Sequence, residues 1–102
     1  MEIKHLNDND FEENTRSGVA LVDFFATWCG PCKIMGPILE NAQEDLKDVK
    51  IFKVDVDENE TTARNFGVMS IPTLVLLKDG KEVKRHVGLL NHDDLIDFVN
   101  NN

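Results

Sequence analysis

The chain has 102 residues, a formal net charge of -8 and 41% hydrophobic residues. These values indicate one globular domain over residues 1–102, and the acidic balance argues against binding to nucleic acid or to an anionic membrane. The first residues lack a signal-peptide pattern, no apolar stretch is long enough to cross a bilayer, and nothing indicates an obligate partner. We therefore expect a monomeric cytoplasmic protein.

The first half of the chain predicts strands that alternate with helices. Residues 2–5 suit a short edge strand, and Asn7 is a good N-cap for a helix that ends near Arg16. Residues 19–26 are apolar on both faces, as expected for a central strand that helices cover. Residues 31–46 repeat apolar side chains at helical spacing, so they predict a long helix.

The second half predicts three further strands and two further helices. They are a strand at 49–54, a short helix capped by Asp57 and ended by Gly67, strands at 73–77 and 82–87, and a last helix capped by Asn91. Asp79-Gly80 is a tight-turn pair, so the last two strands form a C-terminal antiparallel hairpin. Helices between the early strands imply parallel pairing. The expected fold is α/β, with a central mixed five-stranded sheet flanked by four helices.

The only two cysteines lie in the string Trp28-Cys29-Gly30-Pro31-Cys32, between the central strand and the long helix. Pro31 suits the first helical turn, which places Cys29 beside the unpaired N–H groups and the positive end of the helix dipole. We expect a lowered pKa for Cys29, and a more buried and less acidic Cys32. Disulfide exchange needs this asymmetry between an attacking thiol and a resolving thiol.

Two other interpretations of the cysteine pair are less favourable. A purely structural disulfide closes too small a ring to stabilise the whole chain. A zinc site needs two more ligands, and the three histidines, His5, His86 and His92, are scattered and not at Cys–His ligand spacing. The sequence therefore predicts no metal site.

Further residues extend the cysteine motif into a longer pattern. They are the run from Val22 to Lys33 (VDFFATWCGPCK), Pro37, the run from Lys53 to Asp57 (KVDVD), Ile71-Pro72-Thr73-Leu74, Asp79-Gly80 and Gly88. With these residues the chain resembles the thioredoxin family over nearly its whole length, and the resemblance implies the thioredoxin fold. Phe25 departs from the family, since many members carry a second tryptophan there, and Thr27 replaces a frequent acidic residue or proline. Neither departure touches the chemistry.

Two charged residues stand in apolar strands. Asp23 shares a strand face with Leu21 and Phe25, and burial there would raise its pKa. The resemblance implies that Asp23 lies beneath the cysteines and helps to deprotonate Cys32, and that Lys53 is its partner and tunes the shared proton. The alternatives are an aspartate at a solvated strand end and an exposed lysine on an edge strand.

The resemblance also implies a substrate-binding surface around the cysteines. Pro72 would be cis and face them, which leaves the backbone of Ile71 free to pair with a substrate strand. The surface consists of Trp28, Gly30, Pro31, Ile71, Pro72 and Gly88. The alternatives are a core tryptophan, a proline that merely begins a strand, and a glycine that merely makes a turn.

The activity that the resemblance implies is general protein disulfide reduction through the CGPC motif. The redox group is a Cys29–Cys32 disulfide without any bound cofactor, recharged by an NADPH-dependent thioredoxin reductase. Implied substrates are ribonucleotide reductase, methionine sulfoxide reductase and peroxiredoxins. One alternative is a disulfide isomerase or oxidase on the same fold, although Gly30-Pro31 lacks the histidine typical of isomerases. The other is a binding module whose surface changes with redox state.

Overall fold

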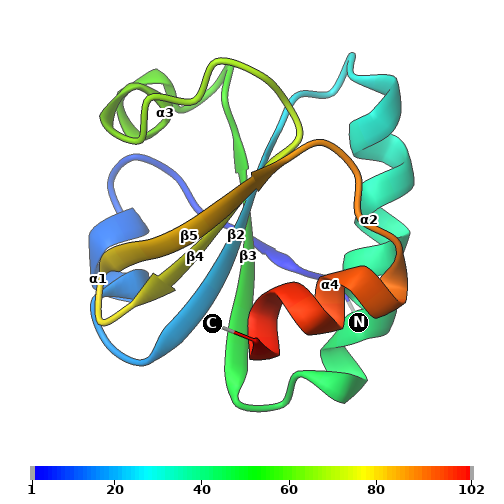
Figure 1. Cartoon of the computed structure of the whole chain (residues 1–102). Helices are drawn as coiled ribbons and strands as arrows, with labels where there is room; N and C mark the ends of the chain where they lie inside the picture. Colours follow the sequence, from blue (N-terminus) through cyan, green and yellow to red (C-terminus); the bar gives the residue numbers. More distant parts are fainter. Residues whose placement is uncertain (1, 102) are drawn as a thin grey trace.

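Residues 2–101, which the computed structural model describes, form a central five-stranded sheet flanked by four helices (Figure 1). The strands are β1 (Lys4–His5), β2 (Val19–Phe25), β3 (Val49–Asp55), β4 (Thr73–Lys78) and β5 (Lys81–Val87). The helices are α1 (Phe11–Thr15), α2 (Gly30–Ala42), α3 (Glu60–Asn65) and α4 (His92–Asn100), and the 3₁₀ turn η1 (Gln43–Asp45) follows α2. This architecture confirms the expected fold class.

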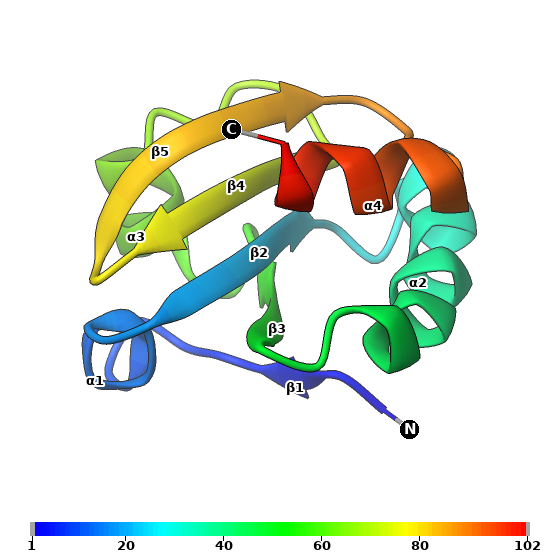
Figure 2. The ribbon, with the colours of Figure 1, turned by 60° about the horizontal axis from the view of Figure 1, so that its bottom comes forward.

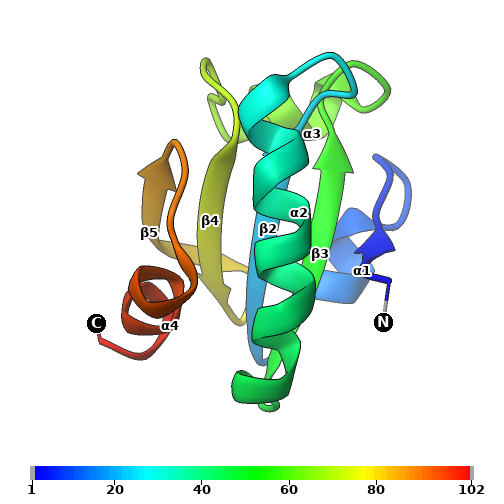
Figure 3. The same cartoon turned by 90° about the vertical axis from the view of Figure 1, so that its right-hand side faces the viewer.

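The strand order is β1-β3-β2-β4-β5, so β2 lies at the centre (Figure 3). β2 and β3 are parallel and joined through α2, whereas β4 is antiparallel to both β2 and β5. The parallel pairing and the terminal hairpin are as predicted. Asp79 and Gly80 form the hairpin turn, with φ values of 51° and 84° that a tight turn of this kind requires.

The two faces of the sheet carry separate clusters of apolar side chains, which explains why β2 is apolar on both faces. α2 and α4 cover one face, where Met35, Leu39 and Leu95 pack against Leu21 of β2. α1 and α3 lie on the other face, where Phe24 is fully buried (Figure 2). Asp23 lies between Phe24 and Val22 in sequence, and strand alternation therefore directs its side chain to the α2 face.

Three predicted helix boundaries need correction. α1 begins at Phe11, because residues 7–10 form a turn in which Asn7 Oδ1 accepts the Asp10 N–H at 3.0 Å. α2 ends at Ala42 and gives way to η1. The N-cap of α3 is Asn59 and not Asp57, whose side chain is used elsewhere. For α4 the prediction is confirmed, since Asn91 Oδ1 accepts the Asp94 N–H at 2.8 Å.

Candidate redox site

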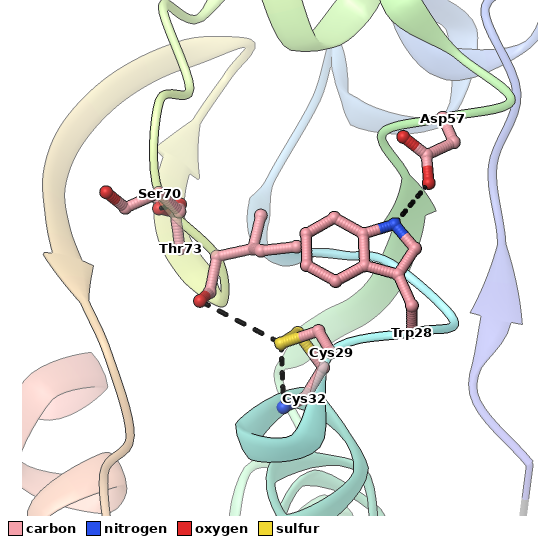
Figure 4. The surroundings of a disulfide bond; sticks show 7 residues. Trp28, Cys29, Cys32, Asp57, Ser70 and Thr73 are labelled. Carbon is pink, nitrogen blue, oxygen red and sulfur yellow. Dashed lines mark hydrogen bonds between the residues drawn. A yellow bond between two sulfur atoms is a disulfide. The ribbon is translucent and has the colours of Figure 1, made fainter.

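The two cysteines lie where β2 ends and α2 begins. Cys29 is the N-cap of α2, in an extended conformation that turns its side chain back over the first helical turn. Its Sγ atom accepts the Cys32 N–H at 3.2 Å and is bonded to Cys32 Sγ (Figure 4). The sulfur therefore satisfies one of the unpaired N–H donors at the helix start, where negative charge is stabilised.

Both cysteines are buried to nearly the same extent, with 5% of Cys29 and 3% of Cys32 exposed. The predicted contrast in burial is thus slight. What distinguishes the two sulfurs is the hydrogen bond, which Cys29 Sγ accepts from the backbone of Cys32. The two positions therefore differ in the hydrogen-bond donor that faces the Cys29 sulfur, and not in exposure to solvent.

The loop before β4 closes over the cysteine pair. The Ile71–Pro72 peptide bond is cis, and the Ile71 carbonyl oxygen lies 3.9 Å from Cys29 Sγ. Pro72 is buried, and its carbonyl accepts the Gly88 N–H at 2.8 Å. The Thr73 hydroxyl donates to the Ser70 carbonyl within the same loop. Segments that are far apart in the chain therefore meet at one end of the sheet.

Trp28 lies on the surface beside the pair, with 70% of its area exposed, so the alternative of a core tryptophan is wrong. Its indole N–H donates to Asp57 Oδ2 at 2.8 Å (Figure 4). Gly30 and Pro31 are exposed as well, and Ile71 and Gly88 are half-buried. Trp28, Gly30 and Pro31 are next to the cysteines in the chain, and the Ile71 carbonyl lies 3.9 Å from Cys29 Sγ. Gly88 is joined to this loop through its hydrogen bond to the Pro72 carbonyl.

Sequence reasoning missed the role of Asp57 as the partner of Trp28. Asp57 follows β3 and Trp28 follows β2, and these strands are parallel neighbours. The carboxyl ends of parallel neighbouring strands meet at one edge of the sheet, so the parallel pairing of β2 and β3 could have predicted this contact. An aspartate just before a helix is also a common N-cap, and this local pattern predicts the wrong role for Asp57.

Asp23 is fully buried, so the alternative of a solvated strand end is wrong. Neither of its carboxylate oxygens has a hydrogen-bond partner among the described residues. Burial raises the pKa of Asp23 to about 7, and the positive charge of Lys53 opposes the shift. A carboxyl group in this state can hold or release a proton near neutral pH.

Lys53 is the register partner of Asp23 on the neighbouring strand. Because β3 lies between β1 and β2, Lys53 is not on an edge strand, and its side chain is half-buried. Its Nζ atom lies 4.4 Å from the centre of the Phe25 ring, and a Cβ on Gly36 of α2 would meet it at 3.6 Å. The amine therefore lies between the sheet and α2 without a direct hydrogen bond to Asp23.

No group of three or more His, Cys, Asp or Glu side chains within residues 2–101 is arranged to hold a metal ion. None of the helices in that range has the length and apolar character to span a membrane.

A redox pair at a helix N-terminus on this fold defines a thiol–disulfide oxidoreductase. The Thioredoxin family model matches residues 2–101. The chain is 48% identical to the thioredoxin of Bacillus subtilis (strain 168) over 101 residues, 98% of this chain and 97% of that protein. It is 47% identical to the thioredoxin of Chlamydia muridarum over 97 residues, 95% of each.

A solved structure agrees with these sequence comparisons. A mutant thioredoxin from Halobacterium salinarum NRC-1 superposes with a TM-score of 0.88 at 38% identity, covering 96% of this chain and 88% of that chain. The chain therefore belongs to the thioredoxin family, with the disulfide oxidoreductase activity of a thioredoxin.

The buried carboxyl group leads to a prediction about stability. Asp23 is protonated in the folded protein up to about pH 7, but in the unfolded chain it ionises near its ordinary pKa of 3.8. The wild type should therefore lose stability relative to Asp23→Asn as the pH rises from 4 to 7, by roughly 4 kcal/mol in total. Urea unfolding of both proteins between pH 4 and pH 9 measures the difference.

The matched control is Asp48→Asn, which makes the same chemical change at an exposed position. Its unfolding free energy, measured in the same way, shows what the same substitution does at a position that is not buried. Parallel curves for Asp23→Asn and the wild type would mean that burial does not raise the pKa of Asp23 in the folded protein.

Proposed function

We propose that the chain is a general protein disulfide reductase that acts through Cys29 and Cys32. The observation that carries the proposal is the position of Cys29 Sγ, which accepts the Cys32 N–H at the N-terminus of α2. In the reduced protein the same position stabilises a thiolate, and the thiolate is the nucleophile in disulfide exchange.

Substrate access supports a docking surface around the nucleophile. Because only 5% of Cys29 is exposed, a substrate disulfide reaches its sulfur only when the substrate lies flat against the surrounding residues. We define the docking surface as Trp28, Gly30, Pro31, Ile71, Pro72 and Gly88. The backbone of Ile71 can pair with an extended substrate segment beside the sulfur, as a strand added to a sheet edge does.

The proposed reaction has two exchange steps. The Cys29 thiolate attacks one sulfur of the substrate disulfide, forms a mixed disulfide and releases the first substrate thiol after proton uptake. The Cys32 thiolate then attacks Cys29 Sγ, and the second substrate thiol leaves. The substrate gains two electrons and two protons, and the protein ends with the Cys29–Cys32 disulfide.

Asp23 takes the proton of Cys32 in the second step, directly or through water. Its fully buried carboxyl group, with a pKa raised to about 7 by desolvation, suits proton exchange near neutral pH. Lys53, the register partner of Asp23, favours the ionised carboxylate and so tunes this exchange. In this proposal Lys53 is a positioning residue that acts through Asp23.

The electrons come from NADPH through a thioredoxin reductase, and the chain works as a monomer in the cytoplasm. Family membership supports such a reductase as donor and disulfide-containing proteins as acceptors. The proposed acceptors are ribonucleotide reductase, methionine sulfoxide reductase and peroxiredoxins. The redox group is the cysteine pair itself, without a bound cofactor.

Cysteine variants test the assignment of the two thiols, with insulin as substrate and dithiothreitol as electron donor. Cys29→Ser should abolish catalysed reduction, because no nucleophile remains. Cys32→Ser should accumulate a covalent mixed disulfide with insulin, visible by mass. Catalysed reduction by Cys29→Ser would refute the proposal. If the Cys29→Ser/Cys32→Ser double variant kept the function of the wild type in cells, a binding module would be the better explanation.

A second test addresses proton transfer. Asp23→Asn should slow release of the mixed disulfide, with the largest effect near neutral pH, because the variant cannot accept the Cys32 proton. Stopped-flow measurement of the two exchange steps across pH separates attack by Cys29 from resolution by Cys32. Identical resolution rates for the variant and the wild type at every pH would remove Asp23 from the mechanism.

The redox potential separates a reductase from an oxidase or isomerase. Thioredoxins lie near -270 mV and protein disulfide isomerase near -180 mV, so we expect a value below roughly -250 mV for this chain. Equilibration in graded dithiothreitol and glutathione buffers, followed by thiol trapping and mass measurement, gives the potential. A pair that is readily reduced in mild buffers would support the oxidase or isomerase alternative instead.

A further inference from the structure

Met69 is the most exposed large apolar side chain in the described part of the protein, with 96% of its area accessible to water. It lies in the loop between α3 and β4. Met35, the other methionine within residues 2–101, is fully buried in α2. The two thioethers therefore lie in opposite environments, one in water and one in the core.

The loop that carries Met69 is held in place next to the sulfur pair. Met69 is two residues before Ile71, whose carbonyl oxygen lies 3.9 Å from Cys29 Sγ. Two residues span at most about 7 Å, so the Cα atom of Met69 is within that distance of the Ile71 Cα atom. The Val68 N–H donates to the Ala63 carbonyl at 3.0 Å on the other side of Met69. Figure 4 shows the adjacent Ser70 close to Thr73, across the cysteine pair from Trp28.

The apolar side chain of Met69 can contribute hydrophobic free energy only when a binding partner covers it. In the free protein Met69 buries almost none of its surface, so it contributes little to folding. Its flexible thioether adapts to many apolar surfaces, which suits a protein that docks varied substrates.

We propose that Met69 extends the docking surface on the side of the Ile71 loop, and that it is a modification site at which peroxide oxidation weakens the docking of disulfide substrates. The inference rests on the reductase function proposed above. Hydrogen peroxide transfers one oxygen atom to the Met69 sulfur: the O–O bond breaks, an S–O bond forms and water leaves, with the thioether oxidised by two electrons. The product is a polar sulfoxide, which a methionine sulfoxide reductase can reverse.

In the disulfide form of the protein, no cysteine thiolate competes with Met69 for peroxide. With Cys29 and Cys32 joined, there is no thiolate to begin the cysteine oxidation series. Oxidation places a polar group where an apolar one was, so docking must desolvate that group. The expected result is weaker substrate binding without a change in the exchange chemistry.

The first experiment treats the disulfide form with hydrogen peroxide and follows each methionine peptide by mass. The Met69 peptide should gain one oxygen while the Met35 peptide stays unmodified. Met1 lies outside the described residues, and its peptide is scored separately. Modification of Met35 before or together with Met69 would overturn the proposal.

The second experiment measures insulin reduction after the peroxide has been removed, at a fixed dithiothreitol concentration. KM for insulin should rise roughly fivefold, the effect of losing one good interface contact, while kcat stays the same. Met69→Gln should show a raised KM without peroxide. Met69→Leu cannot form a sulfoxide, so its KM should be the same before and after treatment.

Val83→Gln is the matched control, because Val83 is also an exposed apolar residue but lies near the opposite end of β5 from Gly88. Its KM should equal that of the wild type before treatment. An unchanged KM in fully sulfoxidised wild type, or an equal rise in Met69→Leu, would overturn the role of Met69 and leave the reductase proposal standing. Failure of the untreated protein to reduce insulin in a Cys29-dependent way would overturn both.

Discussion

The contact on which the site depends is the packing of the N-terminus of α2 at the carboxyl end of the central strand β2. β2 is buried on both faces, so the direction of the chain as it leaves the sheet is fixed by the core. Cys29 is the residue at which strand becomes helix, and its sulfur takes the place that a capping oxygen would take in another helix. The helix start therefore supplies both a structural cap and a site for a thiolate.

The central strand β2 also contains a buried polar residue, Asp23, which destabilises the folded protein. Asp23 occupies a fully buried position between Val22 and Phe24, with no hydrogen-bond partner among the described residues for either oxygen. An apolar side chain there would suit the core better, because desolvation penalises a polar group without partners. Burial of apolar side chains elsewhere in the core offsets this destabilisation; Leu21, Met35 and Leu39, for example, are fully buried.

Much of the fold was readable from local sequence, because strands and helices follow from hydrophobic spacing and turn chemistry. The Asp79-Gly80 hairpin and the Asn91 cap are decided by a few neighbouring residues, and both were predicted correctly. The position of Lys53 was not decided locally. Whether it lies on an edge strand depends on the order of strands in the sheet, which one sequence does not specify.

The misassigned role of Asp57 has a similar origin. A short-range pattern made Asp57 a helix cap, but a residue from a different strand end competes for its carboxylate. The burial of Cys29 was underestimated for the same reason, since the Ile71 loop, more than forty residues later in the chain, closes over it. Sequence reasoning was most accurate where a feature is settled by neighbours, and least accurate where distant segments meet.

The hydrogen bond between Trp28 and Asp57 has an optical consequence. Trp28 is the only tryptophan of the chain, and there is no tyrosine. The near-ultraviolet emission of the protein therefore originates almost entirely from one indole ring, which Asp57 holds beside the disulfide. Because the ring lies beside the redox pair, we expect its emission to change when the Cys29–Cys32 bond opens. The protein would then carry its own reporter of redox state in a single side chain, Trp28.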